Sequence, residues 1–416
     1  MQIMKDEELL KVELKLSFDF FWETANIDKN SKGFGLIPDT TKNMTVCSIA
    51  SVGFGLSAYV IGVERGFITK DAAVKRIIGT LKTLYNNVDH YKGFFAHFVH
   101  MNDGSKYKKT EYSTIDTALL INGMFTCQTY FNNDEINSLS KAIYDRIDWL
   151  SFVKTRGNKK VFAMSYNPEK DGDYRDDSSS DGYIFSWHMM AEQLMMYFQA
   201  AANDNVSQEL ALDLYFGFDR QVGSYHGENI VFSPGASLFI YQFSHAWFPF
   251  QDYNDLYGFD WFKNSKYAIL ANREYCAHNK KYPSQTNLVW GLSACYAPNG
   301  YVVSGALPHD IRLESNRDGD GTIAPYAILA SLPFIEKEVK QSMNYIYETY
   351  PESFGKYGFV DGINLEQNWF SNEYLGLDKG VTLLMIDNYF HGTTWKYYEE
   401  NELIQKAIVK LGFTKK

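Results

Sequence analysis

Two stretches decide the fold: residues 46–61, VCSIASVGFGLSAYVI, and residues 115–130, IDTALLINGMFTCQTY. Each stretch carries apolar side chains on nearly every side of a helix. A helix of this kind is usually buried, with neighbouring elements packed around it. Both stretches therefore predict helices in the interior of the molecule.

Other stretches repeat apolar residues at positions i, i+3, i+4 and i+7, the spacing of a helix with one buried face. They cover residues 10–21, 74–84, 136–150 and 339–347. Thr69 and Asp134 precede the second and third of these stretches and are the predicted N-caps. We expect these helices to keep one face in water and to pack through the other.

An alternation of buried and amphipathic helices is what a double ring of helices requires. The stretches between the helices are rich in Gly and aromatic residues, with few and short strand signals and no Pro/Ser-rich linker. We therefore predict an all-α fold, an α/α barrel, formed by a single domain over residues 1–416. A helical-repeat solenoid is the alternative, although the sequence shows no repeat of fixed period.

The composition argues against several classes of partner. Forty Lys and Arg against fifty Asp and Glu give a net charge of −10, which disfavours binding to nucleic acid or to an anionic membrane. No run approaches the roughly 18 apolar residues that span a bilayer. The charged start also lacks the apolar core of a signal peptide. The sequence predicts a cytoplasmic protein, or a secreted or periplasmic one if a leader has been removed.

Neither the cysteines nor the acidic runs predict a metal site. The four cysteines, Cys47, Cys127, Cys276 and Cys295, are scattered and are expected to be buried thiols. Residues 316–321, NRDGDG, resemble the start of a calcium loop, but Ala327 stands where the bidentate Glu belongs. An acidic turn is therefore favoured there, and a solvated loop is expected at residues 171–181. The P-loop, HExxH and GxSxG motifs are absent, and no cofactor is predicted.

Glu111 and Asp116 are the first candidates for chemistry. Glu111 stands just before the apolar helix of residues 115–130, and Asp116 lies inside its first turns. The helix dipole and free N–H groups favour a carboxylate at a helix start, which is a purely structural explanation for Glu111. In apolar surroundings Asp116 must find partners or shift its pKa, and both are typical of active sites.

Glu192 is the second candidate. It lies in WHMMAEQLMMY, residues 187–197, and has Met and Leu close by in the sequence. Apolar surroundings disfavour the charged carboxylate and raise its pKa, as a general acid at neutral pH requires. The alternative is a buried Glu that a neighbouring Arg, Tyr or backbone group satisfies. Trp187, in the same stretch, is a predicted substrate-binding residue.

Aromatic residues make up 16% of the chain, and we expect some of them to bind sugar. Residues 238–250, LFIYQFSHAWFPF, mix rings with Gln, Ser and His, as a sugar platform does. The predicted substrate-binding residues of this stretch are Tyr241, Gln242, His245 and Trp247. Weaker candidates in or beside later loops are Trp290, Asp320, Tyr357 and Trp369. Phe18, Phe21 and Phe125 lie on helix faces and are expected in the core.

Taken together, these stretches resemble the glucoamylase-like glycoside hydrolases, a family that includes bacterial β-1,2-glucanases and sophorose-releasing enzymes. The matching text appears in family order and covers nearly the whole chain. It comprises residues 20–23 (FFWE), 48–56 (SIASVGFGL), 93–98 (GFFAHF), 111–120 (EYSTIDTALL), the Glu192 segment, 241–247 (YQFSHAW), 320–325 (DGTIAP), 355–359 (GKYGF) and 387–389 (DNY) with Trp395. These motifs are specific as a set, although singly they are not.

The resemblance implies an (α/α)6 barrel of six helical hairpins. It implies hydrolysis of β-1,2-linked glucan or its oligosaccharides by an inverting route, with no cofactor. No obligate protein partner is predicted from the sequence. By matching position, Glu192 falls on the residue proposed as the family's general acid. Glu111 and Asp116 fall on its acidic cluster and are the candidates for the base. His97, in the matching GFFAHF text, is a predicted substrate-binding residue.

Several alternatives stay open. Asp320, Asp361 and Asp387 are the alternative bases, because a sequence does not place loops around a ring. A transglycosylase, a phosphorolytic relative or a non-catalytic glucan-binding protein are alternative functions. The chain also departs from the family at residues 200–206, AANDNVS, which contain no Pro, and at the expanded loop of residues 171–181. These departures bear on the length of the substrate. A cytoplasmic enzyme would meet short imported oligosaccharides, so a cytoplasmic location would favour exo action.

Overall fold

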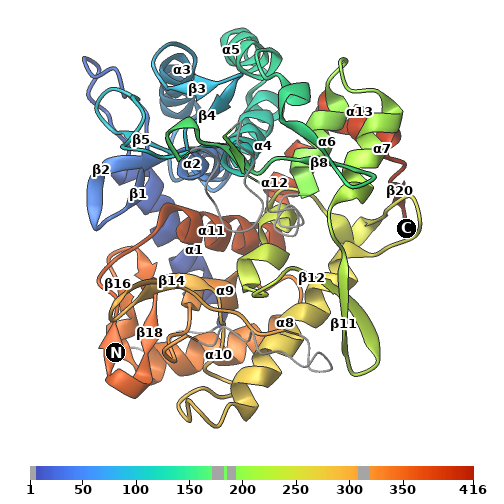
Figure 1. The fold of residues 1–416 in the computed structure, drawn as a ribbon. Coiled ribbons are helices and arrows are strands. Elements are labelled where there is room, and N and C mark those ends of the chain that lie inside the picture. The colour runs from blue at the N-terminus through green and yellow to red at the C-terminus, as the bar shows by residue number, and fades with distance from the viewer. Residues whose placement is uncertain (1–5, 171–181, 185–193, 308–318) are drawn as a thin grey trace.

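The computed structural model describes residues 6–170, 182–184, 194–307 and 319–416, and most of the regular structure is helical (Figure 1). The helices are α1 (Asp6–Thr24), α2 (Ile49–Glu64), α3 (Lys70–Asn86), α4 (Thr114–Phe131), α5 (Asp134–Asp145), α6 (Leu194–Ala202), α7 (Gln208–Gly217), α8 (Trp261–His278), α9 (Pro325–Leu329), α10 (Glu336–Thr349), α11 (Gly376–Phe390), α12 (Thr393–Glu399) and α13 (Glu402–Leu411).

The strands are short. They are β1 (Pro38–Thr40), β2 (Asn43–Ser48), β3 (His90–Tyr91), β4 (Phe94–Phe95), β5 (Phe98–His100), β6 (Tyr112–Ser113), β7 (Val153–Arg156), β8 (Lys159–Phe162), β9 (Ser165–Tyr166), β10 (Tyr183–Ile184), β11 (Gln221–Tyr225), β12 (Glu228–Phe232), β13 (Tyr253–Asn254), β14 (Ala294–Ala297), β15 (Gly300–Val303), β16 (Phe354–Gly355), β17 (Gly358–Phe359), β18 (Ile363–Asn364), β19 (Trp369–Phe370) and β20 (Thr414–Lys415). They pair antiparallel into sheets of two or three strands. Strands are therefore more numerous than the sequence predicts.

The helices α2 and α4 are the interior helices that the sequence predicts, since most of the side chains of each are buried. Their backbones come unusually close together at two glycines. A Cβ atom on Gly53 would lie 2.2 Å from the carbonyl oxygen of Leu119, and one on Gly123 would lie 2.0 Å from the carbonyl oxygen of Gly53. Because only glycine permits this approach, the crossing fixes the position of α4 on α2.

The remaining helices surround this pair. Figure 1 shows α11 beside α2 in the middle of the molecule, with α3 and α5 at the top and α8 and α10 at the bottom. Helices α3, α5, α10 and α13 each bury one face, as expected for amphipathic helices. Thr69 caps α3 by accepting a hydrogen bond from the N–H of Ala72 (3.3 Å), which confirms the predicted cap.

The sequence prediction for residues 136–150 is partly wrong. Helix α5 ends at Asp145, and residues 149–152 form a separate 3-10 turn that Asp148 caps. The guanidinium of Arg146, between the two, donates hydrogen bonds to the carbonyls of Leu84 and Tyr85. The chain therefore turns where α5 meets the end of α3. The cap of α5 is Asn133, one residue before the predicted Asp134.

The sheet β1-β2-β5 positions one end of the candidate site. Residues 46–48, predicted as helix, belong to β2 instead, where Val46 pairs with His100 and Ser48 with Phe98. This register places His97 beside the start of α2, so that its carbonyl accepts a hydrogen bond from the N–H of Ile49 (3.1 Å). The backbone of His97 is thereby tied to an interior helix.

The core contains the residues that the sequence assigns to it. All four cysteines are buried free thiols. Phe18, Phe21 and Phe125 are buried on the inner faces of α1 and α4. Within the described ranges, no helix combines the length and the apolar character needed to cross a membrane.

Gly53→Ala tests the crossing of α2 and α4. The new methyl group would meet backbone atoms of α4, so we expect the free energy of unfolding to fall by about 2–3 kcal/mol. Gly55→Ala is the matched control on the same helix, because its methyl group would meet the end of the Ile37 side chain, which can move. The control should lose less than about 1 kcal/mol. Equal losses in urea unfolding would contradict a crossing set by backbone contact.

Candidate active site

The start of α4 positions an acidic cluster. Ser113 is the N-cap residue of α4, and its Oγ accepts a hydrogen bond from the N–H of Asp116 (3.1 Å). The same Oγ donates to Oδ2 of Asp116 (2.6 Å). Glu111 directly precedes β6, the strand that ends at this cap. The cap therefore orients the Asp116 carboxylate where the free N–H groups of a helix stabilise an acidic group.

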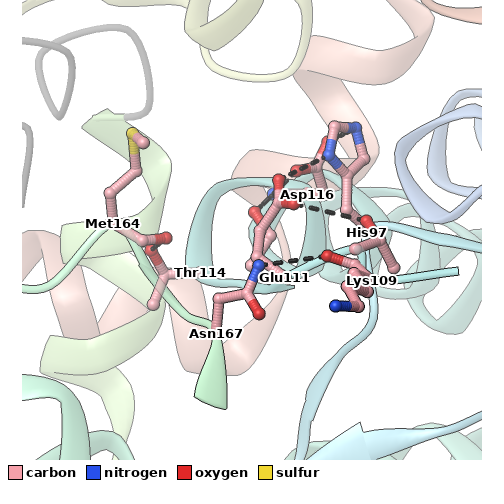
Figure 2. Close-up of polar contacts among 9 residues, drawn as sticks. His97, Lys109, Glu111, Thr114, Asp116, Met164 and Asn167 are labelled. Carbon is pink, nitrogen blue, oxygen red and sulfur yellow. Dashed lines mark hydrogen bonds and ion pairs between the residues drawn. The ribbon is translucent and has the colours of Figure 1, made fainter. Parts of the chain in front are cut away.

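His97 lies between the two carboxylates, as Figure 2 shows. Its Nδ1 is 2.8 Å from Oε1 of Glu111, and its Nε2 is 3.5 Å from Oδ1 of Asp116. The backbone N–H of His97 also donates to the carbonyl oxygen of Glu111 (2.9 Å). One imidazole ring thus contacts both Glu111 and Asp116.

His97 and Glu111 shift each other's pKa. Burial lowers the pKa of His97, but the charges of Asp116 and Glu111 outweigh burial and raise that pKa to about 9. Burial alone would raise the pKa of Glu111, but the hydrogen bond from His97 and the charge of His97 lower that pKa to about 2. At neutral pH His97 is therefore an imidazolium and Glu111 a carboxylate.

Hydrogen bonds from residues 164–167 hold the loop that carries Glu111 (Figure 2). Strand β6 pairs with β9. Oγ1 of Thr114 donates to the carbonyl oxygen of Met164 (2.7 Å). Nδ2 of Asn167 donates to the carbonyl oxygen of Lys109 (3.1 Å). The chain is thus fixed on both sides of Glu111, which limits the movement of its carboxylate.

A cavity of about 410 Å³ adjoins the cluster. Its described lining combines carboxyl groups with aromatic and aliphatic side chains, the mixture found in sites for small polar ligands. The lining consists of Asp39, His97, Phe98, Glu111, Ser113, Ile115, Asp116, Leu119, Met164, Ser165, Phe239, Phe243, Ala294, Tyr296, Tyr301, Tyr326, Leu375, Leu377 and Asp378. Glu111, Asp116 and His97, selected from the sequence, therefore share one cavity.

Two further carboxyl groups line this cavity. Burial raises the pKa of Asp39 to about 6, with Asp116 adding to the shift and His97 opposing it. Burial and the charge of Asp361 raise the pKa of Asp378 well above its usual range. Burial also raises the pKa of Asp361, which hydrogen-bonds to Asp378, to about 6. Carboxyl groups with raised pKa values are suited to proton transfer near neutral pH.

Sequence reasoning missed both Asp39 and Asp378. Asp378 shows the same sequence pattern as Asp116, because it is a carboxylate in the first turn of an apolar helix, α11. Asp39 follows Pro38 in a three-residue strand, and no local pattern marks it. Asp361, a predicted alternative base, is buried against Asp378 and is not among the described lining residues.

The predicted sugar platform at residues 238–250 lies mostly in the core. Nε2 of Gln242 donates to the carbonyl oxygen of Ala327 (2.8 Å), and Nε1 of Trp247 donates to Oγ of Ser57 (2.8 Å). Phe239 and Phe243 from this stretch do line the cavity, which was not specifically predicted.

Tyr241 and His245 are also buried, and neither belongs to the described lining of the cavity beside His97. Nε2 of His245 is 2.8 Å from Oγ of Ser265, and burial lowers the pKa of His245 to about 3. An imidazole in such surroundings stays neutral. Of the described residues, no three His, Cys, Asp or Glu side chains are grouped as metal ligands.

The later candidates also lie apart from this lining. Nε1 of the buried Trp290 donates to Ser342 (2.8 Å). The hydroxyl of Tyr357 donates to Glu23 (3.1 Å). Oδ1 of Asp320 accepts hydrogen bonds from the N–H (3.1 Å) and hydroxyl (2.6 Å) of Thr322, as an acidic turn does.

Two remaining candidates are placed elsewhere, and two are not described. Trp369 is half-buried in β19. Asp387 is fully buried in α11, with Oδ1 3.4 Å from Nε of Arg65. Glu192 and Trp187 lie outside the described residues, as does the charged run of residues 171–181.

Known proteins resemble this chain over nearly its whole length. An exo β-1,2-glucooligosaccharide sophorohydrolase (non-reducing end) of Parabacteroides distasonis is 27% identical and matches 98% of this chain. The chain spans only 58% of the length of that curated relative. An endo-β-1,2-glucanase of Chitinophaga pinensis, solved with sophorotriose and glucose, superposes with a TM-score of 0.82. It is 23% identical, and the match covers 99% of each chain, which establishes a shared fold.

A β-1,2-glucanase of Parabacteroides distasonis, 24% identical, also has this fold, with a TM-score of 0.82 over 98% of this chain and 60% of that one. Residues 184–402 match the family model "Glycoamylase: Putative glucoamylase". This match takes in more than half of the chain, including α11 with Asp378 and the hairpin β14–β15 of the cavity wall. The chain therefore belongs to the Glycoamylase family.

Proposed function

We propose that the chain hydrolyses β-1,2-glucosidic bonds in β-1,2-glucan or its oligosaccharides. The observation that carries the proposal is the grouping of Asp39, Glu111, Asp116 and Asp378 with His97 around one cavity. Hydrolysis of a glycosidic bond requires two carboxyl groups with different protonation states at one site. The apolar part of the lining suits the C–H faces of sugar rings. The linkage comes from the relatives, whose names specify β-1,2-linked glucose.

We also propose that this site lies in an (α/α)6 barrel formed by a single domain over residues 1–416. Among the residues that the structure describes, five helices are almost wholly buried, namely α2, α4, α6, α9 and α11. The buried 3-10 turns over residues 238–246 would complete an inner ring of six elements. The contacts of α2 with α4 and α11, and of α4 with α6, are consistent with neighbours in such a ring.

Glu192 is our proposed general acid, from its position in the family motif. Among the predicted bases, Glu111 is the less suitable, because a carboxylate with a pKa near 2 accepts a proton poorly at neutral pH. Its contact with His97 suits a positioning role. Asp116 is our proposed base. Asp39 is a second candidate, since its pKa of about 6 leaves it ionised at neutral pH and able to accept a proton.

An inverting mechanism gives a specific stereochemical outcome. Water attacks the face opposite the leaving group, so digestion of β-1,2-glucan should first release the α-anomer. The change in optical rotation during digestion, followed by the rotation change after base is added, reports which anomer forms. Initial release of the β-anomer would show retention and contradict the proposed roles. Dependence of the products on added phosphate would instead indicate phosphorolysis.

Glu192→Gln tests the general acid. Removing proton donation to the leaving oxygen should lower kcat about 10³-fold while the melting temperature stays near that of the wild type. Glu209→Gln, at an exposed position in the first turn of α7, is the matched control and should retain full activity. A variant that unfolds while each folded molecule keeps its activity would assign Glu192 to the core instead.

The pair of His97 and Glu111 makes stability depend on pH. The folded state raises the pKa of His97 from 6.5 to about 9, so the stabilisation is complete below pH 6.5 and is lost as the pH rises through 9. The difference in unfolding free energy between the wild type and His97→Gln should therefore shrink over this interval. Urea unfolding at several pH values measures the difference, and a constant value would contradict the ion pair. In a Glu111→Gln background the pH dependence should be weaker.

A further inference from the structure

The hairpin β14–β15 forms part of the cavity wall. Tyr296 and Tyr301 are directly paired across the hairpin, and both line the cavity together with Asp39 and Asp378. Tyr301 is 53% exposed although it belongs to a cavity wall. Exposure of a large flat ring beside acidic groups leaves an apolar face open to a ligand. None of the residues predicted from the sequence to bind sugar lies on this hairpin.

The hairpin is firmly anchored. The backbone N–H of Tyr296 donates to Oδ2 of the buried Asp361 (2.6 Å). Nζ of Lys42 lies 4.8 Å from the ring centroid of Tyr296. The rings of Tyr296 and Tyr301 meet edge to face, with centroids 5.8 Å apart and planes at 81°. These contacts hold Tyr301 in place before any ligand binds, which reduces the entropy lost on binding.

The phenol of Tyr301 is also suited to hydrogen bonding. A tyrosine hydroxyl is protonated at neutral pH, because its ordinary pKa is about 10. The hydroxyl therefore stays protonated and can donate to a sugar oxygen. An apolar face with a polar edge is the combination that a pyranose ring requires, since its C–H groups face one way and its hydroxyls project around the rim.

We infer that Tyr301 is a specificity-determining residue, the stacking platform for one glucose unit of the substrate, and that it favours oligosaccharides long enough to reach the hairpin β14–β15. The inference rests on the proposed function. Asp361 and Lys42 act through the hairpin as positioning residues. Tyr301 contributes binding energy for a sugar unit that does not itself react, so its effect depends on chain length.

The test compares the wild type, Tyr301→Ala and Tyr301→Phe on a series of purified β-1,2-gluco-oligosaccharides of increasing length. We expect Tyr301→Ala to lower kcat/KM about tenfold on the longer members, mainly through KM, with little change on the shortest substrate that is cleaved. Tyr301→Phe keeps the ring and should stay within about twofold of the wild type on every member. Tyr257→Ala is the matched control, because Tyr257 is 79% exposed and is not among the lining residues of the cavity.

The outcomes separate the inference from the proposed function. Equal effects of Tyr301→Ala and Tyr257→Ala, or a loss that is the same at every chain length, would overturn the platform while leaving the hydrolysis intact. A loss in Tyr301→Phe as large as that in Tyr301→Ala would also overturn it. Failure of the wild type to cleave any member would contradict the proposed function itself. If Tyr301→Ala melts below the wild type, Tyr301→Leu replaces it, because leucine keeps apolar bulk without a flat face.

Discussion

The ion pair between His97 and Glu111 holds the acidic wall of the cavity together. Asp39, Glu111 and Asp116 interact with the same imidazole, and the raised pKa of His97 gives that ring a full positive charge at neutral pH. Carboxylates grouped in one cavity wall repel each other and so disfavour the ionised form. The imidazolium offsets this repulsion and keeps Glu111 ionised. The wall therefore contains a carboxylate that stays ionised, Glu111, beside a carboxyl group whose pKa lies closer to neutrality, Asp39.

The fold places these charges through backbone contacts of the two interior helices. His97 is tied to the start of α2 by the sheet β1-β2-β5, and Asp116 is capped at the start of α4. The close crossing at Gly53 and Gly123 sets one helix on the other. A side chain in place of either glycine would separate the helices and move Asp116 relative to His97. The site and the centre of the core therefore depend on the same contact.

Local patterns in the sequence are sufficient to predict the interior helices and to mark Glu111 and Asp116 as candidates, but not Asp39 or Asp378. Asp116 was recognisable because a carboxylate in an apolar helix needs partners, and the structure supplies Ser113 and His97. Residues 238–250 are misleading because a sugar platform and a buried core can share one composition, aromatic rings mixed with polar side chains. In the core, the polar groups hydrogen-bond to other parts of the protein instead of to a sugar. Trp247 finds its partner in Ser57, far away in the sequence. Asp39 and Tyr301 reach the cavity only through tertiary packing, and no local pattern marks either of them.

The most direct test of the central claim measures which glucosidic linkage the chain cleaves and whether cleavage depends on the cluster around His97. Linear β-1,2-glucan, β-1,3-glucan, β-1,4-glucan and α-1,4-glucan are incubated at equal mass concentration with the wild type and with Asp116→Asn, and new reducing ends are counted. We predict that the wild type releases reducing ends from β-1,2-glucan alone and that Asp116→Asn reduces this release at least about 100-fold. Release from α-1,4-glucan but not β-1,2-glucan, or full activity in Asp116→Asn, would contradict the account.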